Sequence, residues 1–309
     1  MNRSYKKKSN KIINKRKKNT IKNHFSSLRC SPISNHTVNK NTCYNSEMIN
    51  ELVYNWNKKH KNNKIDNNLN SNEKYKQLQN RLQDKCSDER CWASELVQTD
   101  VDKYLELFAP YSPSTWINNP TEWLSNIEII MTLKQYEKYD KSFKFLGTTP
   151  IDFDTVINNK CVTTSLCRFS LTKYIKKGIN KIGIIFNTDK HDQSGSHWIS
   201  LYIDIHNKLI FFFDSAGDQC PQEILNLVNR IIQQGKTINI LFKFEQNYPM
   251  VHQTGTTECG MYCLFFIINM VKNSLPINYF KTKRIPDEEM IKYRNIYFNK
   301  SSASTSSSS

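Results

Sequence analysis

Apolar positions at helical spacing dominate the first part of the chain after residue 46. Two groups follow this pattern, the first made of Met48, Leu52, Val53 and Trp56 and the second of Tyr75, Leu78 and Leu82. Spacings of three and four residues place such side chains on one face of an amphipathic helix. The pattern therefore predicts a helical accessory arm over residues 47–110.

The pattern changes after Gly147, where short apolar runs between polar loops predict β-strands. The expected strands are Ile182–Asn187, Trp198–Ile205, Leu209–Phe213 and Ile238–Glu245. We expect one helix to open at Pro120, because proline is favourable as a first helical residue, and another to run from Pro221 to Gln234. These elements predict an α+β domain over residues 111–300 with a mixed central sheet.

A further helix is expected to begin at Cys259. Its residues Met261–Val271 are apolar on all sides, which is typical of a helix buried at the centre of a domain. This run is the longest apolar stretch in the chain and is shorter than the roughly 20 residues that cross a bilayer. We therefore expect no transmembrane segment and no contact with a membrane.

Both ends of the chain lack periodicity. Residues 1–46 hold twelve Lys and Arg and no Asp or Glu, so the remaining residues carry only 16 − 12 = +4 of the net charge of +16. Residues 301–309 are mostly serine. We expect both ends to be disordered. The basic segment predicts nonspecific, salt-dependent contact with DNA, or alternatively a localisation signal.

The nine cysteines are expected to be mostly free thiols. No apolar segment follows the basic N-terminus, so we expect no signal peptide and a reducing compartment, where disulfides are rare. Cys86 and Cys91 could act as metal ligands with Cys30 and Cys43, but no Cys-x-x-Cys or His-x-x-x-His pair is present. We favour structural thiols in the arm and expect neither a metal nor an organic cofactor.

One thiol has the surroundings of a nucleophile. Cys259 lies in the segment Thr256–Gly260, where a polar loop, expected to be exposed, leads into the apolar helix. Unpaired N–H groups at a helix N-terminus favour a thiolate, and Gly260 lets the backbone approach a substrate closely. An inert buried cysteine is the alternative, which Cys263 fits better. We predict that Cys259 is the nucleophile.

Strand pairing supplies a base and an acid that orients it. If residues 206–207 form the turn of a hairpin, paired residues have numbers that sum to about 413, and Asp214 lies within one or two residues of His197. Asp204 has the same chemistry but lies about 23 Å along the strand. We predict His197 as the general base and Asp214 as the residue that orients it.

Gln253 stands six residues before Cys259. Its amide could donate a hydrogen bond to an oxyanion, as such groups do in acyl transfer, although a surface glutamine is the plain alternative. His252 and His191 are competing bases in polar loops, each without an evident orienting acid.

Taken in order, these residues resemble a known superfamily. His197-Trp198, Phe213-Asp214-Ser215, Gln253 and Glu258-Cys259-Gly260 are similar to the motifs of the ubiquitin-like-protein (SUMO-type) and adenovirus-type cysteine proteases. The order His, Asp, Gln, Cys is that of the superfamily. Trp123-Leu124-Ser125-Asn126 resembles its Trp-Leu-Asn-Asp helix start, with Asn126 in place of the last Asp.

Four segments also resemble the polyprotein-processing proteases of African swine fever virus and other large DNA viruses. They are Asn187–Asp189, Gly195–Trp198, Asp214–Gly217 and Thr257–Gly260. Those proteases carry Asn where this chain has Asp214, so the chain departs toward the SUMO-type pattern. The segment from Cys86 to Cys91 is similar to part of their N-terminal arm, and the resemblance covers roughly residues 86–298.

The resemblance implies a cysteine endopeptidase that cuts after Gly-Gly or a similar small pair, with Trp198 and Trp123 enclosing the substrate. Its substrates would be structural polyproteins processed during virion maturation, in the viral factory of the host cytoplasm and in the virion. Host ubiquitin-like modifiers are the alternative substrates. A basic nucleic-acid-binding protein on an inactive protease fold is disfavoured, because every catalytic position holds a competent residue. Both tryptophans could alternatively be core residues.

Overall fold

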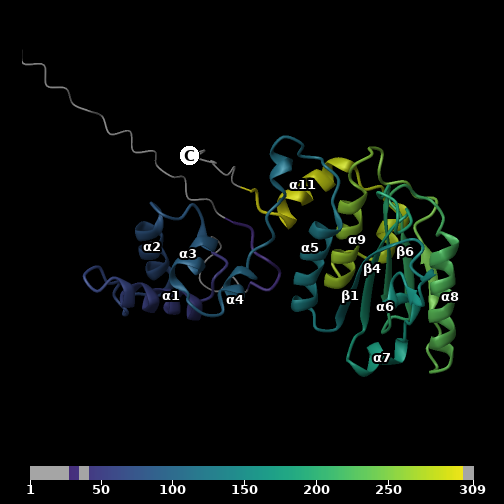
Figure 1. Ribbon diagram of the computed structural model, residues 1–309, viewed down its shortest axis with the longest axis horizontal. Helices are drawn as coiled ribbons and strands as arrows, with labels where there is room; N and C mark the ends of the chain where they lie inside the picture. The colour runs from purple at the N-terminus through teal and green to yellow at the C-terminus, as the bar shows by residue number, and fades with distance from the viewer. Residues whose placement is uncertain (1–27, 35–41, 302–309) are drawn as a thin grey trace, which may run out of the picture.

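A five-stranded mixed sheet is built from strands between residues 143 and 246 (Figure 1). The computed structural model of the chain describes residues 28–34 and 42–301. In spatial order the strands of the sheet are β1 (Phe143–Pro150), β4 (Lys181–Asn187), β5 (Trp198–Asp204), β6 (Leu209–Phe213) and β7 (Lys243–Gln246). The outer pairs are parallel and the two central pairs antiparallel. A separate hairpin joins β2 (Val156–Ile157) to β3 (Lys160–Cys161). The α+β class with a mixed sheet is confirmed.

Helices cover both faces of this sheet (Figure 1). One face carries α5 (Asn126–Tyr139), α9 (Cys259–Lys272), α10 (Ile277–Thr282) and α11 (Asp287–Tyr297). The other carries α6 (Thr164–Cys167), α7 (Leu171–Lys176) and α8 (Gln222–Lys236). Successive side chains of a strand point to opposite faces. Along β5, Trp198 and Tyr202 therefore join the first core, whereas Ile199 and Leu201 join the second.

Helix α9 is buried along almost its whole length. Every residue from Cys259 to Val271 is buried, against β5 of the sheet and between α5 and α11. This surrounding explains why the sequence is apolar on all sides, as expected for a central helix.

Four further helices form a separate core in the N-terminal arm. They are α1 (Ser46–Lys59), α2 (Ser71–Leu82), α3 (Glu89–Leu96) and α4 (Val101–Leu105), and the short 3-10 helix η1 (Ser114–Ile117) follows them. The first two helices agree with the apolar spacing of the sequence. A bridge between Cys30 and Phe108 lies within the arm, and one between Tyr111 and Asn299 joins the connecting segment to the C-terminal end.

The expectation of mostly free thiols is wrong. All nine cysteines lie among the described residues, and six form the disulfides Cys30–Cys43, Cys86–Cys91 and Cys161–Cys167. Their Cα atoms are 5.3 to 6.3 Å apart, within the range that a disulfide bridges. The inference from cellular compartment contained no information on which cysteines fold together.

Residues 28–34 and 42–46 also differ from the expected disordered tail. Cys43 and Tyr44 are buried in the arm core, and Ser31 is buried too. The disulfide and the apolar contacts of Tyr44 hold this segment, although its composition is polar. Residues 1–27, 35–41 and 302–309, which include most of the basic segment and the serine-rich end, lie outside the described residues.

Two element boundaries differ from prediction. Helix α5 begins at Asn126 and not at Pro120, because the Ser125 side chain caps the helix and Glu128 bonds back to the Ser125 N–H. The strand expected over 238–245 is limited to β7. The preceding residues form a turn after α8, with Asn239 in the left-handed region (φ 61°).

Candidate active site

The β5–β6 hairpin brings His197 and Asp214 together. Ser200 pairs with Phe213, so paired numbers sum to 413, which confirms the predicted register. His197 Nε2 lies 2.7 Å from Asp214 Oδ1. Asp204 pairs with Leu209 at the opposite end of the hairpin, away from this pair.

The position of Asp214 is set by its neighbours. The Ala216 N–H donates to Asp214 Oδ1 (2.9 Å), and the buried Asn247 side chain bonds both the N–H and the C=O of Asp214 (2.8 and 2.7 Å). The turn also requires Gly217, which has φ 78° and whose Cβ would lie 2.9 Å from Met250 O. Asn247 was not singled out in the sequence, because no local pattern marks a side chain 33 residues away.

Cys259 completes the group at the first residue of α9. It is 1% exposed, so the expected exposed nucleophile is instead buried beside the imidazole. Burial by itself would lower the pKa of His197, but hydrogen bonds and charge interactions with Asp214 and Cys259 raise this pKa to about 10. Because Nε2 faces Asp214, Nδ1 is the nitrogen left for the thiol.

The other two free cysteines lack such partners. Burial raises the pKa of Cys220 to about 12, and burial together with the nearby Cys259 raises the pKa of Cys263 well above its ordinary value. A thiol held in its protonated form is a poor nucleophile. The arrangement therefore favours Cys259 among the free thiols.

Gln253 lies beside this group but is engaged with its neighbours. Its Oε1 accepts from Ser215 Oγ (2.8 Å) and its Nε2 donates to Gly255 O (2.9 Å). The Ser215 carbonyl also accepts from the Gln253 N–H (2.9 Å). The glutamine is thus tied to the residue that follows Asp214, with its amide directed at the loop before Cys259.

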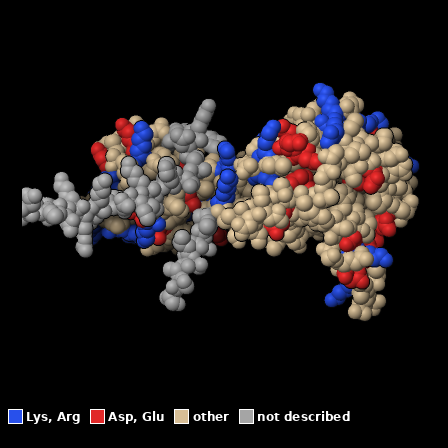
Figure 2. All heavy atoms as spheres, turned by 90° about the horizontal axis from the view of Figure 1, so that it is seen from above, with Lys and Arg blue, Asp and Glu red and all other residues tan. Residues whose placement is uncertain are grey.

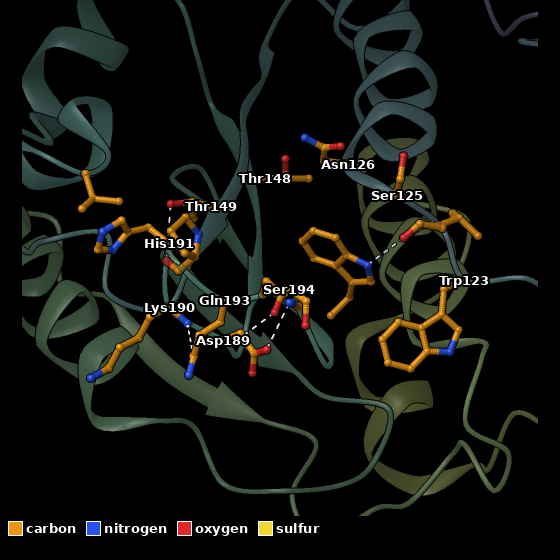
Figure 3. A pocket seen from close by; sticks show the side chains of 16 residues that line it. Trp123, Ser125, Asn126, Thr148, Thr149, Asp189, Lys190, His191, Gln193 and Ser194 are labelled. Carbon is orange, nitrogen blue, oxygen red and sulfur yellow. Dashed lines mark hydrogen bonds between the residues drawn. The ribbon is translucent and has the colours of Figure 1, made fainter.

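Trp123 and Trp198 line one pocket of about 570 Å³ (Figure 3). Trp198 is 9% exposed and donates from Nε1 to Leu124 O (2.9 Å), whereas Trp123 is 40% exposed. A Cβ on Gly260 would lie 3.0 Å from Leu124 Cβ and 3.3 Å from Trp198 Cδ1. Gly260 therefore permits close packing of these two residues, a role other than the expected approach to a substrate.

The two histidines considered as competing bases differ from expectation. His191, on the rim of the same pocket, has an acid partner, since Nδ1 lies 2.6 Å from Asp152 Oδ2. His252 is fully buried, donates to Phe280 O (2.9 Å) and accepts from the Ile285 N–H (3.2 Å). Both of its ring nitrogens are occupied, so it cannot serve as a base.

Within residues 28–34 and 42–301, no three His, Cys, Asp or Glu side chains are grouped as metal ligands. The same part of the chain contains no helix long and apolar enough to cross a membrane.

Comparison with known proteins agrees with this geometry. The family described as "Ulp1 protease family, C-terminal catalytic domain" matches residues 172–307. A putative thiol protease of Acanthamoeba polyphaga mimivirus is 32% identical over 293 residues, which cover 87% of this chain and 92% of that protein. A SUMO-1 cysteine protease of African swine fever virus (Kenya isolate) is 30% identical over 190 residues, 58% of this chain and 69% of that protein.

A solved structure shares the fold. The crystal structure of the African swine fever virus protease superposes with a TM-score of 0.64 at 24% identity, covering 89% of this chain and 97% of that one. The relatives define a thiol protease. The chain belongs to the Ulp1 protease family and is a cysteine protease.

Proposed function

We propose that this cysteine protease cuts peptide bonds with Cys259 as nucleophile, His197 as base and Asp214 as the residue that orients the base. The observation that carries the proposal is the hydrogen-bonded position of His197 between Asp214 and Cys259, at the N-terminus of α9. This arrangement meets the three needs of a thiol nucleophile: a base, an orienting group and a helix N-terminus.

In the proposed reaction, His197 takes the proton of Cys259, and the thiolate attacks the carbonyl carbon of the peptide bond. The resulting oxyanion accepts hydrogen bonds from the Cys259 N–H and from the Gln253 amide, which exchanges its bond to Gly255 O. Protonated His197 gives its proton to the leaving amine, and a thioester remains. Water then attacks the thioester with His197 as base, releasing the acid and restoring the thiol.

The proposed substrates are viral precursor proteins, cut after Gly-Gly or a similar small pair. The two relatives described above are viral proteases. Trp198 and Trp123 line one pocket, and Trp198 directly follows the proposed base His197 in the chain, so that two indoles would exclude side chains from the residues before the cut. Conjugates of ubiquitin-like modifiers are the second candidate substrates, because the name of one relative is SUMO-1 cysteine protease.

Two mutations and a pair of peptide substrates test the proposed nucleophile and the proposed preference for small residues before the cut. Cys259→Ala is expected to abolish cleavage of a Gly-Gly peptide, whereas Cys220→Ala, a change at another buried free thiol, retains it. Trp123→Ala, at the exposed indole, is expected to raise the relative rate on Ala-Ala peptides roughly tenfold, since about 1 to 2 kcal/mol of steric discrimination is lost. Viral precursors and ubiquitin-like conjugates are compared in the same assay.

An active Cys259→Ala chain refutes the nucleophile. A Trp123→Ala chain with unchanged preference between Gly-Gly and Ala-Ala refutes only the proposal that the two indoles exclude side chains before the cut. Preferential cleavage of ubiquitin-like conjugates over viral precursors would select the second substrate class.

A further inference from the structure

The loop that leads to the proposed nucleophile, here called the nucleophile loop, is held at both ends by one helix, α11. This loop, residues 254–258, connects Gln253 to Cys259 and has no helix or strand of its own. Its first residues bond Asp287, which begins α11, and its last residue bonds Arg294 of the same helix.

Asp287 gathers the start of the loop. Its carboxylate accepts from the Thr254 N–H (3.1 Å), from Thr254 Oγ1 (2.7 Å) and from the Gly255 N–H (2.8 Å). It also accepts from the Tyr262 hydroxyl (2.8 Å), in the first turn of α9. Burial would raise the pKa of Asp287, but these donors hold it below its ordinary value, so the carboxylate is charged at neutral pH.

Arg294 holds the end of the loop. Its Nε donates to Glu258 Oε2 (3.0 Å), and the two side chains are only 4% and 3% exposed. Glu258 directly precedes Cys259, so this buried ion pair sets the backbone from which the thiol projects. A guanidinium remains charged at any relevant pH, and an unpaired buried carboxylate is unfavourable, so the two groups depend on each other.

The same arginine also contacts the segment that precedes Trp123. Its Nη2 donates to Thr121 O (3.4 Å), two residues before Trp123, and its Cζ lies 4.5 Å from the centre of the Trp116 ring. Asp287 and Arg294 are seven residues apart, two helical turns, and so lie on one face of α11. One rigid element thereby connects the two ends of the nucleophile loop with the segment that bears Trp123.

We propose that α11 is a clamp for the nucleophile loop, and that Asp287 and Arg294 are positioning residues for the cleavage reaction. The proposal rests on the proposed function, since it takes Cys259 as the nucleophile. The clamp holds Cys259 Sγ against His197 and the Cys259 N–H toward the oxyanion. Neither Asp287 nor Arg294 touches the reacting atoms.

The test compares folded variants of the full chain. Asp287→Asn keeps the side-chain volume, Arg294→Met removes the charge, and Arg294→Lys keeps the charge but lacks the planar fork. Lys292→Met is the matched control, because Lys292 pairs with Glu289 on the exposed side of the same helix. For each variant, kcat, KM, the melting temperature and the rate of iodoacetamide alkylation at Cys259 are measured, the last by peptide mass spectrometry.

We expect Asp287→Asn to lower kcat at least tenfold, to slow alkylation of Cys259, and to change KM less than twofold. Arg294→Met is expected to do the same, with Arg294→Lys intermediate and Lys292→Met like the wild type. If Arg294→Met unfolds, Asp287→Asn decides, since that carboxylate is only partly buried. Wild-type kcat and alkylation in folded Asp287→Asn overturn the clamp, as does a loss of kcat that only matches the loss of folded protein.

A separate variant distinguishes this failure from that of the proposed function. Cys259→Ala is expected to be inactive, because alanine leaves no nucleophile at this position. If it cleaves, the nucleophile assignment fails and the clamp fails with it. If it is inactive while the α11 variants cleave at the wild-type rate, the clamp alone fails.

Discussion

His197 has a proton affinity far above that of an ordinary histidine. Burial opposes this, but the hydrogen bonds to Asp214 and Cys259 outweigh it and raise the pKa to about 10. A raised pKa means that the protonated imidazole is favoured in the folded chain. Its stabilising contribution is complete below the unfolded value near 6.5 and is lost as the pH rises through about 10.

Asp214→Asn is expected to move the alkaline limb of kcat/KM to lower pH. The amide keeps an acceptor for His197 but removes the negative charge that raises the pKa of His197. Activity should fall by roughly 10- to 100-fold, and by more in Asp214→Ala, where the acceptor is lost as well. A pH profile of peptide cleavage from about pH 5 to 11 measures both effects, with Asp204→Asn at the far end of the hairpin as control. An alkaline limb that does not move in Asp214→Asn would contradict the assigned cause of the raised pKa.

At the scale of single residues, local pattern predicted some contacts and missed others. The pairing of His197 with Asp214 follows from a short hairpin, whose register depends only on the turn. Asn247, Asp287 and Arg294 reach the site from segments 32 or more residues away from the loops they bond. Asp287 follows Pro286 as a typical acidic helix start, a signal that predicts a helix but does not name its partners.

The beginning of α5 shows how a side chain sets an element boundary. Pro120 suggested a start several residues too early, whereas the capping box of Ser125 and Glu128 defines the start at Asn126. This boundary affects the pocket, because the non-helical residues before the cap include Trp123 and Leu124, which line it. The Leu124 carbonyl then accepts from the Trp198 indole, which a helix continuing from Pro120 would not allow.

Ser125→Ala is expected to destabilise the chain by about 1 kcal/mol and to raise KM severalfold. Loss of the cap frees the segment that carries Trp123 and Leu124, so the substrate pocket becomes less ordered. Asn45→Ala is the matched control, since Asn45 caps α1 in the arm (its side chain accepts from the Met48 N–H, 2.9 Å). Chemical denaturation and peptide kinetics should show a similar loss of stability in both, with raised KM in Ser125→Ala alone. Equal KM values in the two variants would show that the Ser125 cap does not order the substrate pocket.

At the scale of the whole molecule, the arm and the protease part are connected through the C-terminal end. Asn299 follows α11 and bonds the backbone of Arg29 and Ala109 in the arm. Arg29 Nε donates to Asn295 O on α11 (3.2 Å). These contacts between residues 190 to 270 positions apart could not be inferred from any local pattern, although the first two helices of the arm could.

Charge is distributed unevenly between the chain's segments. Residues 1–27 hold ten Lys and Arg, while residues 47–309 carry only +4 in total. On the face shown in Figure 2, basic and acidic side chains of the described residues are interspersed and form no single basic surface. The electrostatic attraction to a polyanion is therefore expected to come mainly from the first 27 residues.

Deleting residues 1–27 is expected to leave peptide cleavage within about twofold and to remove most DNA affinity at low salt. Each phosphate contact contributes about −0.9 to the slope of log K against log salt concentration, so losing ten cations reduces that slope markedly. The contacts of Arg29 with Asn295 and Asn299 remain, which preserves the connection between the arm and α11. Deletion of residues 302–309, which contain no charged side chain, is the matched control and should change neither property. Fluorescence anisotropy with duplex DNA between about 50 and 200 mM salt measures the slope, and peptide turnover is measured on the same samples. If the truncated chain keeps the full-length affinity and slope, DNA binding belongs to the folded part, and the basic segment has another role.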